Sequence, residues 1–250
     1  MRLILSGIAL ASTLLLGAQW GMGPGPGIPL SGSTSHTFTH TSNYAWTSSN
    51  SGATITLSPP SATVAGEFGT LCVQDYNNFS STPPTMTAII GGGVGIPQTL
   101  TMVSGSPAGS NPIYGGYAFL FYVPSLSAYA SPTITITASN TISFSAAWWD
   151  EYSVTGSGAV NLDSQASYNG SYTLPLVPVV SGTNDLLSSC PISNNSLSGV
   201  GGAWVGTGAP TNIYATSYWS TYITNATSST AVAYTGSNAA LTASINASWY

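Results

Sequence analysis

The chain has 250 residues, of which 43% are hydrophobic, 11% aromatic and 3% charged, with a formal net charge of −5. Its one basic residue among Lys and Arg is Arg2. A surface without ammonium or guanidinium groups cannot bind phosphate backbones by counterion release, which excludes nucleic acid as a partner. Six carboxyl groups are too few for acid to add much charge. This composition suits a protein outside the cell, including one in an acidic medium.

Residues 3–16 form a largely apolar run between Arg2 and the small residues Gly17 and Ala18. A basic start, an apolar stretch and small residues are the pattern of a secretory signal peptide. We therefore predict a signal peptide at residues 1–19 and an extracellular mature protein. The alternative is a transmembrane anchor, but spanning a bilayer takes about 20 apolar residues, more than this run provides.

Residues 20–52 are expected to form a spacer and a separate strand. The Gly/Pro-rich stretch 21–29 cannot build regular structure. The next segment alternates with period two, which predicts a strand with one aromatic and one hydroxyl-rich face. Its even positions are His36, Phe38, His40, Ser42, Tyr44 and Trp46. A polar break at 48–52 separates it from the rest of the chain.

Residues 53–250 are expected to form one β domain, because short apolar runs alternate with Gly, Pro and Asn clusters and no helical period is visible. The run 117–123 is apolar on both faces, which predicts a central strand. The fold class is therefore all-β: an antiparallel β-sandwich, Ig-like or jelly-roll-like, with an N-terminal extension strand. The clearest predicted strands are 53–57, 70–74, 86–90, 117–123, 133–137, 142–149, 174–180, 213–219 and 241–249.

Two kinds of covalent modification are predicted for an exported chain. The isolated pair Cys72 and Cys190 is expected to form a disulfide, the alternative being two buried free thiols. Five sequons of the form N-x-S/T stand in polar contexts, and they predict N-glycosylation of a surface protein. The sequon residues are Asn78, Asn169, Asn194, Asn225 and Asn246.

No familiar catalytic or metal-binding motif is present in the sequence. His36 and His40 would lie about 13 Å apart on a strand, too far for one ion, and the adjacent Asp150 and Glu151 would face opposite sides. We therefore predict no catalytic residues, no metal and no cofactor. One enzyme class remains compatible with the sequence, an acid peptidase of the β-sandwich type that would use Glu151 with Gln74 or Gln165.

Residues 53–250 resemble a β-sandwich module of exported bacterial and phage-associated proteins, usually non-catalytic. The shared landmarks, in order, are GTLCVQ (69–74), YAFLFYV (117–123), TITIT (133–137), EYSV (151–154), DSQAS (163–167), NDLL (184–187) and a final ASWY. The layout of the whole chain is similar to the subunit of the archaeal "thread" filaments of thermoacidophiles. That resemblance implies an exported, N-glycosylated subunit that assembles head to tail by donor-strand complementation.

These features together predict a structural subunit of a cell-surface filament, a homopolymer with covalent glycans and surface or cell–cell contacts. Residues 34–47 would leave their own subunit and complete the next one, with Phe38, Tyr44 and Trp46 on the buried face. The same residues could instead pair within their own chain as its first strand. The alternative function is a monomeric adhesin or glycan-binding module whose exposed aromatic rings stack on sugars.

Overall fold

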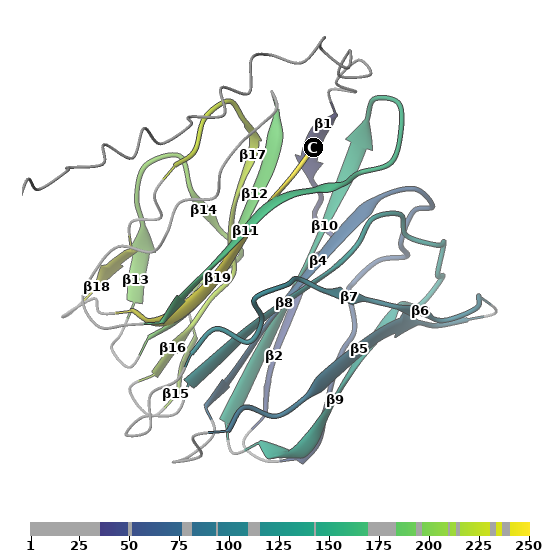
Figure 1. The fold of residues 1–250 in the computed structure, drawn as a ribbon. Helices are drawn as coiled ribbons and strands as arrows, with labels where there is room; N and C mark the ends of the chain where they lie inside the picture. Colours follow the sequence, from purple (N-terminus) through teal and green to yellow (C-terminus); the bar gives the residue numbers. More distant parts are fainter. Residues whose placement is uncertain are drawn as a thin grey trace, which may run out of the picture. The chain divides into compact units, whose positions relative to one another are not determined.

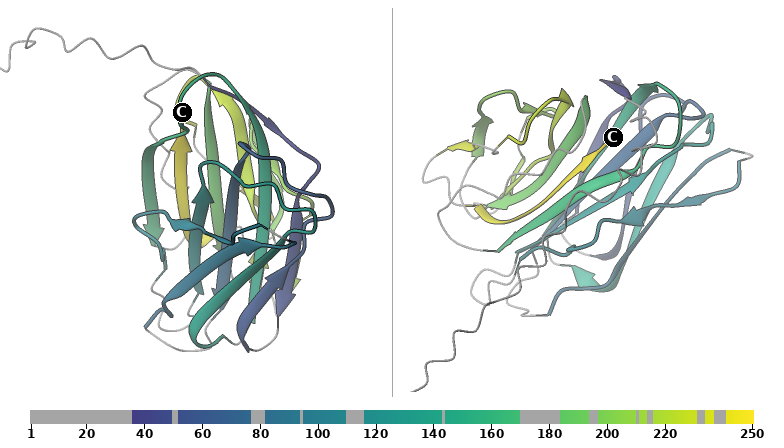
Figure 2. Two further views of the ribbon diagram at one scale, coloured as in Figure 1. Left: turned by 90° about the vertical axis from the view of Figure 1, so that its right-hand side faces the viewer. Right: turned by 45° about the horizontal axis from the view of Figure 1, so that its top comes forward.

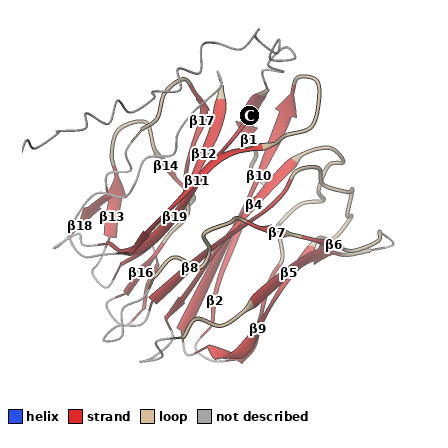
Figure 3. Ribbon diagram, in the orientation of Figure 1, coloured by secondary structure: helices blue, strands red, loops and turns tan. Residues whose placement is uncertain are grey.

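A computed structural model describes residues 36–49, 52–76, 82–93, 95–109, 116–142, 144–169, 184–193, 197–209, 211–213, 216–230, 234–236 and 241–250. All of them belong to one compact unit, Thr34–Tyr250. The described residues contain strands and no helix (Figure 3), and every strand pair is antiparallel. The predicted all-β antiparallel sandwich is confirmed.

Sheet A is the central layer, with strand order β1-β10-β4-β8-β7, and β2 also pairs with β10. Its long strands are apolar on both faces, which is the pattern of strands buried from two sides. The predicted central strand 117–123 is β8, and seven of its eight residues are buried. The strands are β1 (Thr37–His40), β2 (Ala45–Ser49), β4 (Phe68–Tyr76), β7 (Thr101–Met102), β8 (Gly116–Val123) and β10 (Phe144–Thr155).

Sheet B covers one face of sheet A, and its strand order is β3-β9-β5-β6 (Figures 1 and 2). Apolar side chains alternate with threonines along β9, so one face of sheet B is buried and the other is open. Gly69 of β4 leaves room for the Trp149 ring, which a Cβ atom there would meet at 2.1 Å. The strands are β3 (Gly52–Leu57), β5 (Met86–Gly91), β6 (Gln98–Thr99) and β9 (Thr133–Ile142).

Sheet C covers the opposite face of sheet A, around the path β11-β19-β12-β16-β15 with β17 and β14 attached. A small sheet D pairs β13 with β18. The strands of sheet C are β11 (Leu162–Asn169), β12 (Asp185–Ser193), β14 (Val205–Gly206), β15 (Thr211–Ile213), β16 (Thr216–Tyr218), β17 (Thr221–Ala226) and β19 (Leu241–Trp249). Those of sheet D are β13 (Leu197–Val200) and β18 (Tyr234–Gly236).

Two hydrophobic cores result from this layering. The A/B core joins odd-numbered residues of β4, β8 and β10 to sheet B, and it includes Leu71, Phe119 and Trp149. The A/C core joins even-numbered residues of the same strands to sheet C, and it includes Leu120 and Trp148. Because side chains alternate along a strand, one central sheet supplies both cores.

Several predicted strands have different bounds in the structure. The predicted strand 142–149 begins at Phe144 and continues to Thr155, while Ile142 ends β9. The predicted strand 213–219 is divided between β15 and β16, whereas 241–249 matches β19. The predicted strand 174–180, the signal peptide 1–19 and the Gly/Pro stretch 21–29 lie outside the described residues.

Candidate assembly site at the N-terminal edge of the central sheet

The N-terminal segment, which we define as residues 36–49, pairs within its own chain along one edge of β10. β1 pairs with the end of β10 and β2 with its beginning, while β4 pairs along the other edge of β10. In the single chain the segment therefore occupies the cis position that the sequence left open. This edge is where an incoming strand from another subunit would have to bind.

Phe38 anchors β1 in the A/C core. Its side chain is fully buried, and its ring packs edge-on against Phe68, with 6.0 Å between the ring centroids. On the edge of β1 that faces away from β10, the Asn225 side chain makes the backbone hydrogen bonds that a neighbouring strand would otherwise make. Its Oδ1 accepts from the Phe38 N–H at 2.8 Å, and its Nδ2 donates to the Phe38 carbonyl at 3.0 Å. Asn225 has a φ of 56°, a left-handed conformation that Asn tolerates better than most residues.

His40 fixes the end of β1 to a buried carboxylate. Its Nε2 lies 2.8 Å from Oδ1 of Asp150, which is 1% exposed. Two hydroxyls next to strands of sheet C also bind Asp150: Thr207, after β14, donates to Oδ1 at 2.5 Å, and Ser220, before β17, donates to Oδ2 at 2.8 Å. The imidazole also stacks on Tyr222, with 4.3 Å between centroids. This cluster joins the N-terminal segment, β10 and sheet C.

A bend at 41–44 divides the segment into two strands, which corrects the prediction of one continuous strand over 34–47. β1 pairs His40 with Tyr152, and β2 resumes by pairing Ala45 with Trp149. Unbroken antiparallel pairing would have placed Ala45 opposite Ala147, so the bend inserts two residues. Thr41 still bonds to β10, donating its N–H to the Glu151 carbonyl at 2.9 Å.

Of the three predicted anchors, only Phe38 is buried. Tyr44 is 40% exposed and Trp46 is 51% exposed, so their predicted burial is wrong in this chain. Trp46 still points to the same face of sheet A, because it pairs with Trp148 and stacks on its ring at 6.2 Å. Its partner Trp148 belongs to the A/C core, whereas Trp46 itself remains half exposed.

The carboxyl groups are drawn inside the protein. Four of the six are buried, namely those of Asp75, Asp150, Glu151 and Asp185, and Glu67 and Asp163 are half-buried. Burial raises the pKa of Asp75 to about 7. Burial, together with the neighbouring Glu67, raises the pKa of Glu151 to about 8. The described surface therefore carries hardly any charge.

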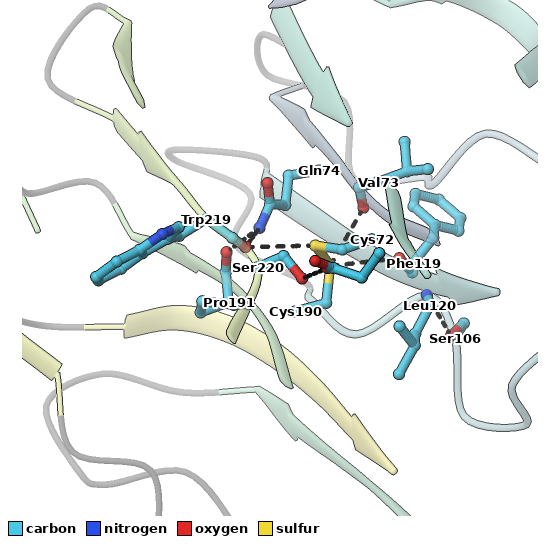
Figure 4. The surroundings of a disulfide bond; sticks show 11 residues. Cys72, Val73, Gln74, Ser106, Phe119, Leu120, Cys190, Pro191, Trp219 and Ser220 are labelled. Atoms are coloured by element: carbon cyan, nitrogen blue, oxygen red, sulfur yellow. Dashed lines mark hydrogen bonds between the residues drawn. A yellow bond between two sulfur atoms is a disulfide. The ribbon is translucent and has the colours of Figure 1, made fainter. Parts of the chain in front are cut away.

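The predicted disulfide between Cys72 and Cys190 is present and joins β4 to β12 across the A/C core (Figure 4). The two residues are 118 apart in sequence. Gln74 continues this cross-link, because its Nε2 donates to the carbonyls of Pro191 and Trp219. Sheets A and C are thus tied together by a covalent bond and by buried polar contacts.

The residues considered for an acid peptidase do not meet. Gln74 points from sheet A toward sheet C, whereas Glu151 lies on the opposite face of sheet A, and their strands pair Gln74 with Ala146 and Glu151 with Gly69. Gln165 is exposed on β11 in sheet C. Neither Gln74 nor Gln165 therefore shares a site with Glu151. His36 and His40 are likewise separated, with His36 Nε2 lying 3.4 Å from the Gly158 carbonyl.

The five sequons have different surroundings. Asn78 and Asn194 lie outside the described residues, and Asn169 ends β11 without a described side chain. Asn225 is half-buried and bonded to Phe38. Asn246 is fully buried on β19, where its Nδ2 donates to Ser244 at 3.3 Å. A glycan has no room there in the folded chain, so we remove Asn246 from the predicted set.

Sequence reasoning missed three residues that hold the N-terminal segment: Asn43, Asn225 and, in its bonding role, His40. Their partners lie 108, 187 and 110 residues away in the sequence. Because no Lys or Arg follows Arg2, the two histidines were the only side chains whose type pointed to pairing with a buried carboxylate, and His40 makes that contact.

No protein-family model, curated protein or solved structure matches this chain. Within the described residues, no helix has the length and apolar character needed to cross a bilayer.

Proposed function

We propose that this chain is a structural, non-enzymatic subunit of an extracellular filament, assembled head to tail when the N-terminal segment of one subunit binds along β10 of the next. The observation that carries the proposal is how the segment is held. Among the described residues, its strands pair on one side only, with β10, and its other hydrogen bonds each involve a side chain on one of the two partners. A second copy of the segment could make the same contacts in trans.

The energy balance between cis and trans depends mainly on the connection between the segment and sheet B. Identical contacts form in both arrangements, which is the condition for strand exchange between protomers. β2 ends at Ser49 in sheet A and β3 begins at Gly52 in sheet B. Gly52 has a φ of 135°, a conformation that glycine adopts readily and other residues rarely do. This short polar connection is the expected hinge.

The nearly uncharged surface and the sequons outside Asn246 also support an extracellular, glycosylated polymer. Subunits with few surface charges do not repel one another when they are packed into a fibre. Hydroxyl, amide and glycan groups keep such a surface hydrated without charge. Covalent glycans and further copies of the chain are therefore the proposed partners, and the resemblance to archaeal threads belongs to the same proposal.

A pair of engineered cysteines tests cis against trans pairing. Thr39 and Ser153 are register partners between β1 and β10, so Thr39→Cys with Ser153→Cys can form a cross-strand disulfide. In a filament of exchanged strands, oxidation should give covalent ladders on non-reducing gels. The control is Ser164→Cys with Ser248→Cys, register partners of β11 and β19, which should cross-link within one chain. Monomers alone from the Thr39/Ser153 variant, in material that forms fibres by electron microscopy, would contradict strand exchange.

The exposed rings of Tyr44 and Trp46 favour a second candidate, a glycan-binding surface on a monomer. They lie two residues apart on adjoining parts of the segment and together offer flat apolar faces among hydroxyl groups. If this candidate is right, the full-length chain should bind oligosaccharides on a glycan array and Trp46→Ala should abolish that binding. Val64→Ala, at another exposed apolar residue, should leave binding unchanged.

A further inference from the structure

A buried carboxyl group lies at the bend of the N-terminal segment. Glu151 of β10 is fully buried and receives two hydrogen bonds on its carboxyl oxygens. Asn43, in the bend, donates from Nδ2 to Oε2 at 2.5 Å, and the N–H of Val64 donates to Oε1 at 3.4 Å. Glu151 therefore contacts both the segment and the loop between β3 and β4.

Asn43 extends this contact into a cross-link between the bend and the loop. Its Oδ1 accepts from the Ser61 N–H at 2.9 Å, and its Nδ2 also approaches the Ala62 carbonyl at 3.5 Å. Asn43 is 6% exposed, so these bonds are made away from water. The position of the bend thus depends on one amide that is shared between the loop and Glu151.

The second carboxyl group of this site belongs to Glu67, at the end of the same loop. The Glu67 side chain lies within hydrogen-bonding reach of Glu151, and this contact helps to raise the pKa of Glu151. An ionised carboxylate can only accept hydrogen bonds, so this contact exists only while at least one of the two groups carries a proton. The pair is therefore a proton-binding site.

Within the described part of the chain, no positively charged side chain is placed to replace that proton. The sequence has no Lys or Arg after Arg2. His40 is bound to Asp150 on the other face of sheet A, and His36 lies beside the Gly158 carbonyl. The remaining neighbours of Glu151, Asn43 and the Val64 N–H, are uncharged. Loss of the shared proton leaves two like charges facing each other in a site with little water.

We propose that Glu67 and Glu151 form a proton-operated clasp that holds the bend of the N-terminal segment in acid and releases it as the pH rises. In a single chain the clasp acts on the segment of that chain. Its role in opening and closing a filament rests on the proposed function, because there Asn43 would come from the neighbouring subunit.

The linkage between proton binding by Glu151 and opening of the bend gives the direction of the pH effect. Burial is the largest cause of the raised pKa of Glu151, and the hydrogen bond to Glu67 adds to it, while Asn43 and the Val64 N–H lower it in part. When the bend opens and water reaches Glu151, its pKa falls toward the ordinary value. Deprotonation therefore favours the open bend. The segment is held best below the ordinary pKa of Glu and is released as the pH passes through about 8.

Hydrogen exchange in the full-length mature chain tests the clasp. After correction for the intrinsic exchange rate, protection of peptides from 37–49 should fall about tenfold or more between about pH 4 and pH 8.5, since one shifted pH unit corresponds to a factor of ten. Protection of β19 peptides should change less. Glu67→Gln should retain protection at the higher pH, because a Gln amide can donate to an ionised Glu151 without adding charge. Glu151→Gln provides a second variant in case the first does not fold.

Asp75→Asn is the matched control, because Asp75 is buried on the same face of sheet A but at the other end of β4, opposite Ser145. It should leave the pH dependence of 37–49 as in the wild type. The clasp is wrong if Glu67→Gln and the wild type show the same pH dependence, if the wild type shows none, or if Asp75→Asn removes it. Electron microscopy of the same samples separates the two proposals, since the exchange result stands whether or not fibres form.

Discussion

The N-terminal segment and β19 both place a large aromatic ring against Phe68, but the chain holds them in different ways. Phe38 lies 6.0 Å and Trp249 lies 5.2 Å from the Phe68 ring, measured between centroids. β19 pairs with β11 on one edge and with β12 on the other. Among the described strands, the N-terminal segment pairs with β10 on one edge only, and its other hydrogen bonds involve side chains.

This difference separates a fixed strand from one that can be exchanged. Removing β19 would break two ladders of main-chain hydrogen bonds and divide sheet C. Removing the N-terminal segment would break one ladder and leave sheet A with β10 as its edge, a strand position that readily accepts another chain. The aromatic anchor is comparable in the two regions, so backbone pairing is what distinguishes them.

The largest effect is expected from Phe38→Ala. Truncating a buried Phe costs about 3–5 kcal/mol, and in a segment paired on one side this loss should release 36–49 and abolish filaments. The free energy of docking can be followed by hydrogen exchange of 37–49, and polymerisation by electron microscopy. Tyr44→Ala is the control, and its exposed ring should contribute less than about 1 kcal/mol. Normal protection of 37–49 in Phe38→Ala would mean that the aromatic anchor does not hold the segment.

Removing the disulfide should destabilise the packing of sheet A against sheet C, the sheet that contains β19. Replacing both cysteines, Cys72→Ala with Cys190→Ala, should lower the free energy of unfolding by about 2–5 kcal/mol, because the bond closes a long loop and joins sheets A and C. Urea unfolding of the mature chain measures this. The pairing of β1 with β10 involves neither cysteine and should persist in native conditions. A loss below about 1 kcal/mol would show that buried polar contacts such as those of Gln74 suffice to join the sheets.

The stability of the whole chain should be higher in acid than at neutral pH. Asp75 and Glu151 have folded-state pKa values of about 7 and about 8, above their unfolded values of about 4. Their favourable contribution is complete below about pH 4 and is lost as the pH rises through 7 to 8, by on the order of 1–4 kcal/mol for each group. Urea unfolding at pH 4 and pH 8.5 measures the sum.

Asp75→Asn separates the two contributions to that pH dependence. It should raise stability at the higher pH and leave the part that is due to Glu151. Greater stability of the wild type at pH 8.5 than at pH 4 would contradict the assignment. Such a result would indicate that the buried carboxyls are ionised and stabilised by groups outside the described residues.

The sequence predicted the fold well where alternation and apolar runs were strong. β19 and β8 were located almost to the residue, and the disulfide followed from an isolated cysteine pair. β12 was missed because its sequence, DLLSSCPIS, combines serines with a proline in the middle of a strand. In the structure Pro191 falls between the stretches of β12 that pair with β17 and β16, so its missing N–H breaks no ladder bond on that side.

The candidate site was less predictable, because it depends on contacts between residues far apart in sequence. Alternation correctly placed Phe38 on a buried face, but it could not show that Trp46, on the same face, remains exposed. The bend at 41–44 is fixed by Asn43, whose partners Ser61 and Glu151 lie in different parts of the chain. Asn246 is likewise fully buried on β19, between β11 and β12, and no local pattern reveals that burial.

The smallest effect is expected where a side chain replaces a backbone partner at the edge of β1. Asn225→Gly removes both hydrogen bonds to Phe38 and keeps a residue that tolerates a positive φ, so the loss reflects the amide rather than backbone strain. It should weaken docking of the N-terminal segment by about 1–2 kcal/mol, the contribution of one or two hydrogen bonds. Hydrogen exchange of 37–49 measures that loss.

Two controls separate this effect from backbone conformation and from glycosylation. Asn184→Gly changes the other non-glycine residue with positive φ among those described, and it should leave 37–49 unchanged. Thr227→Ala removes the sequon at Asn225 but keeps its amide, so it should also leave docking intact. If Thr227→Ala weakens docking as much as Asn225→Gly, a glycan rather than the amide holds the edge of β1. If neither does, pairing with β10 and the Phe38 anchor are sufficient to hold the N-terminal segment.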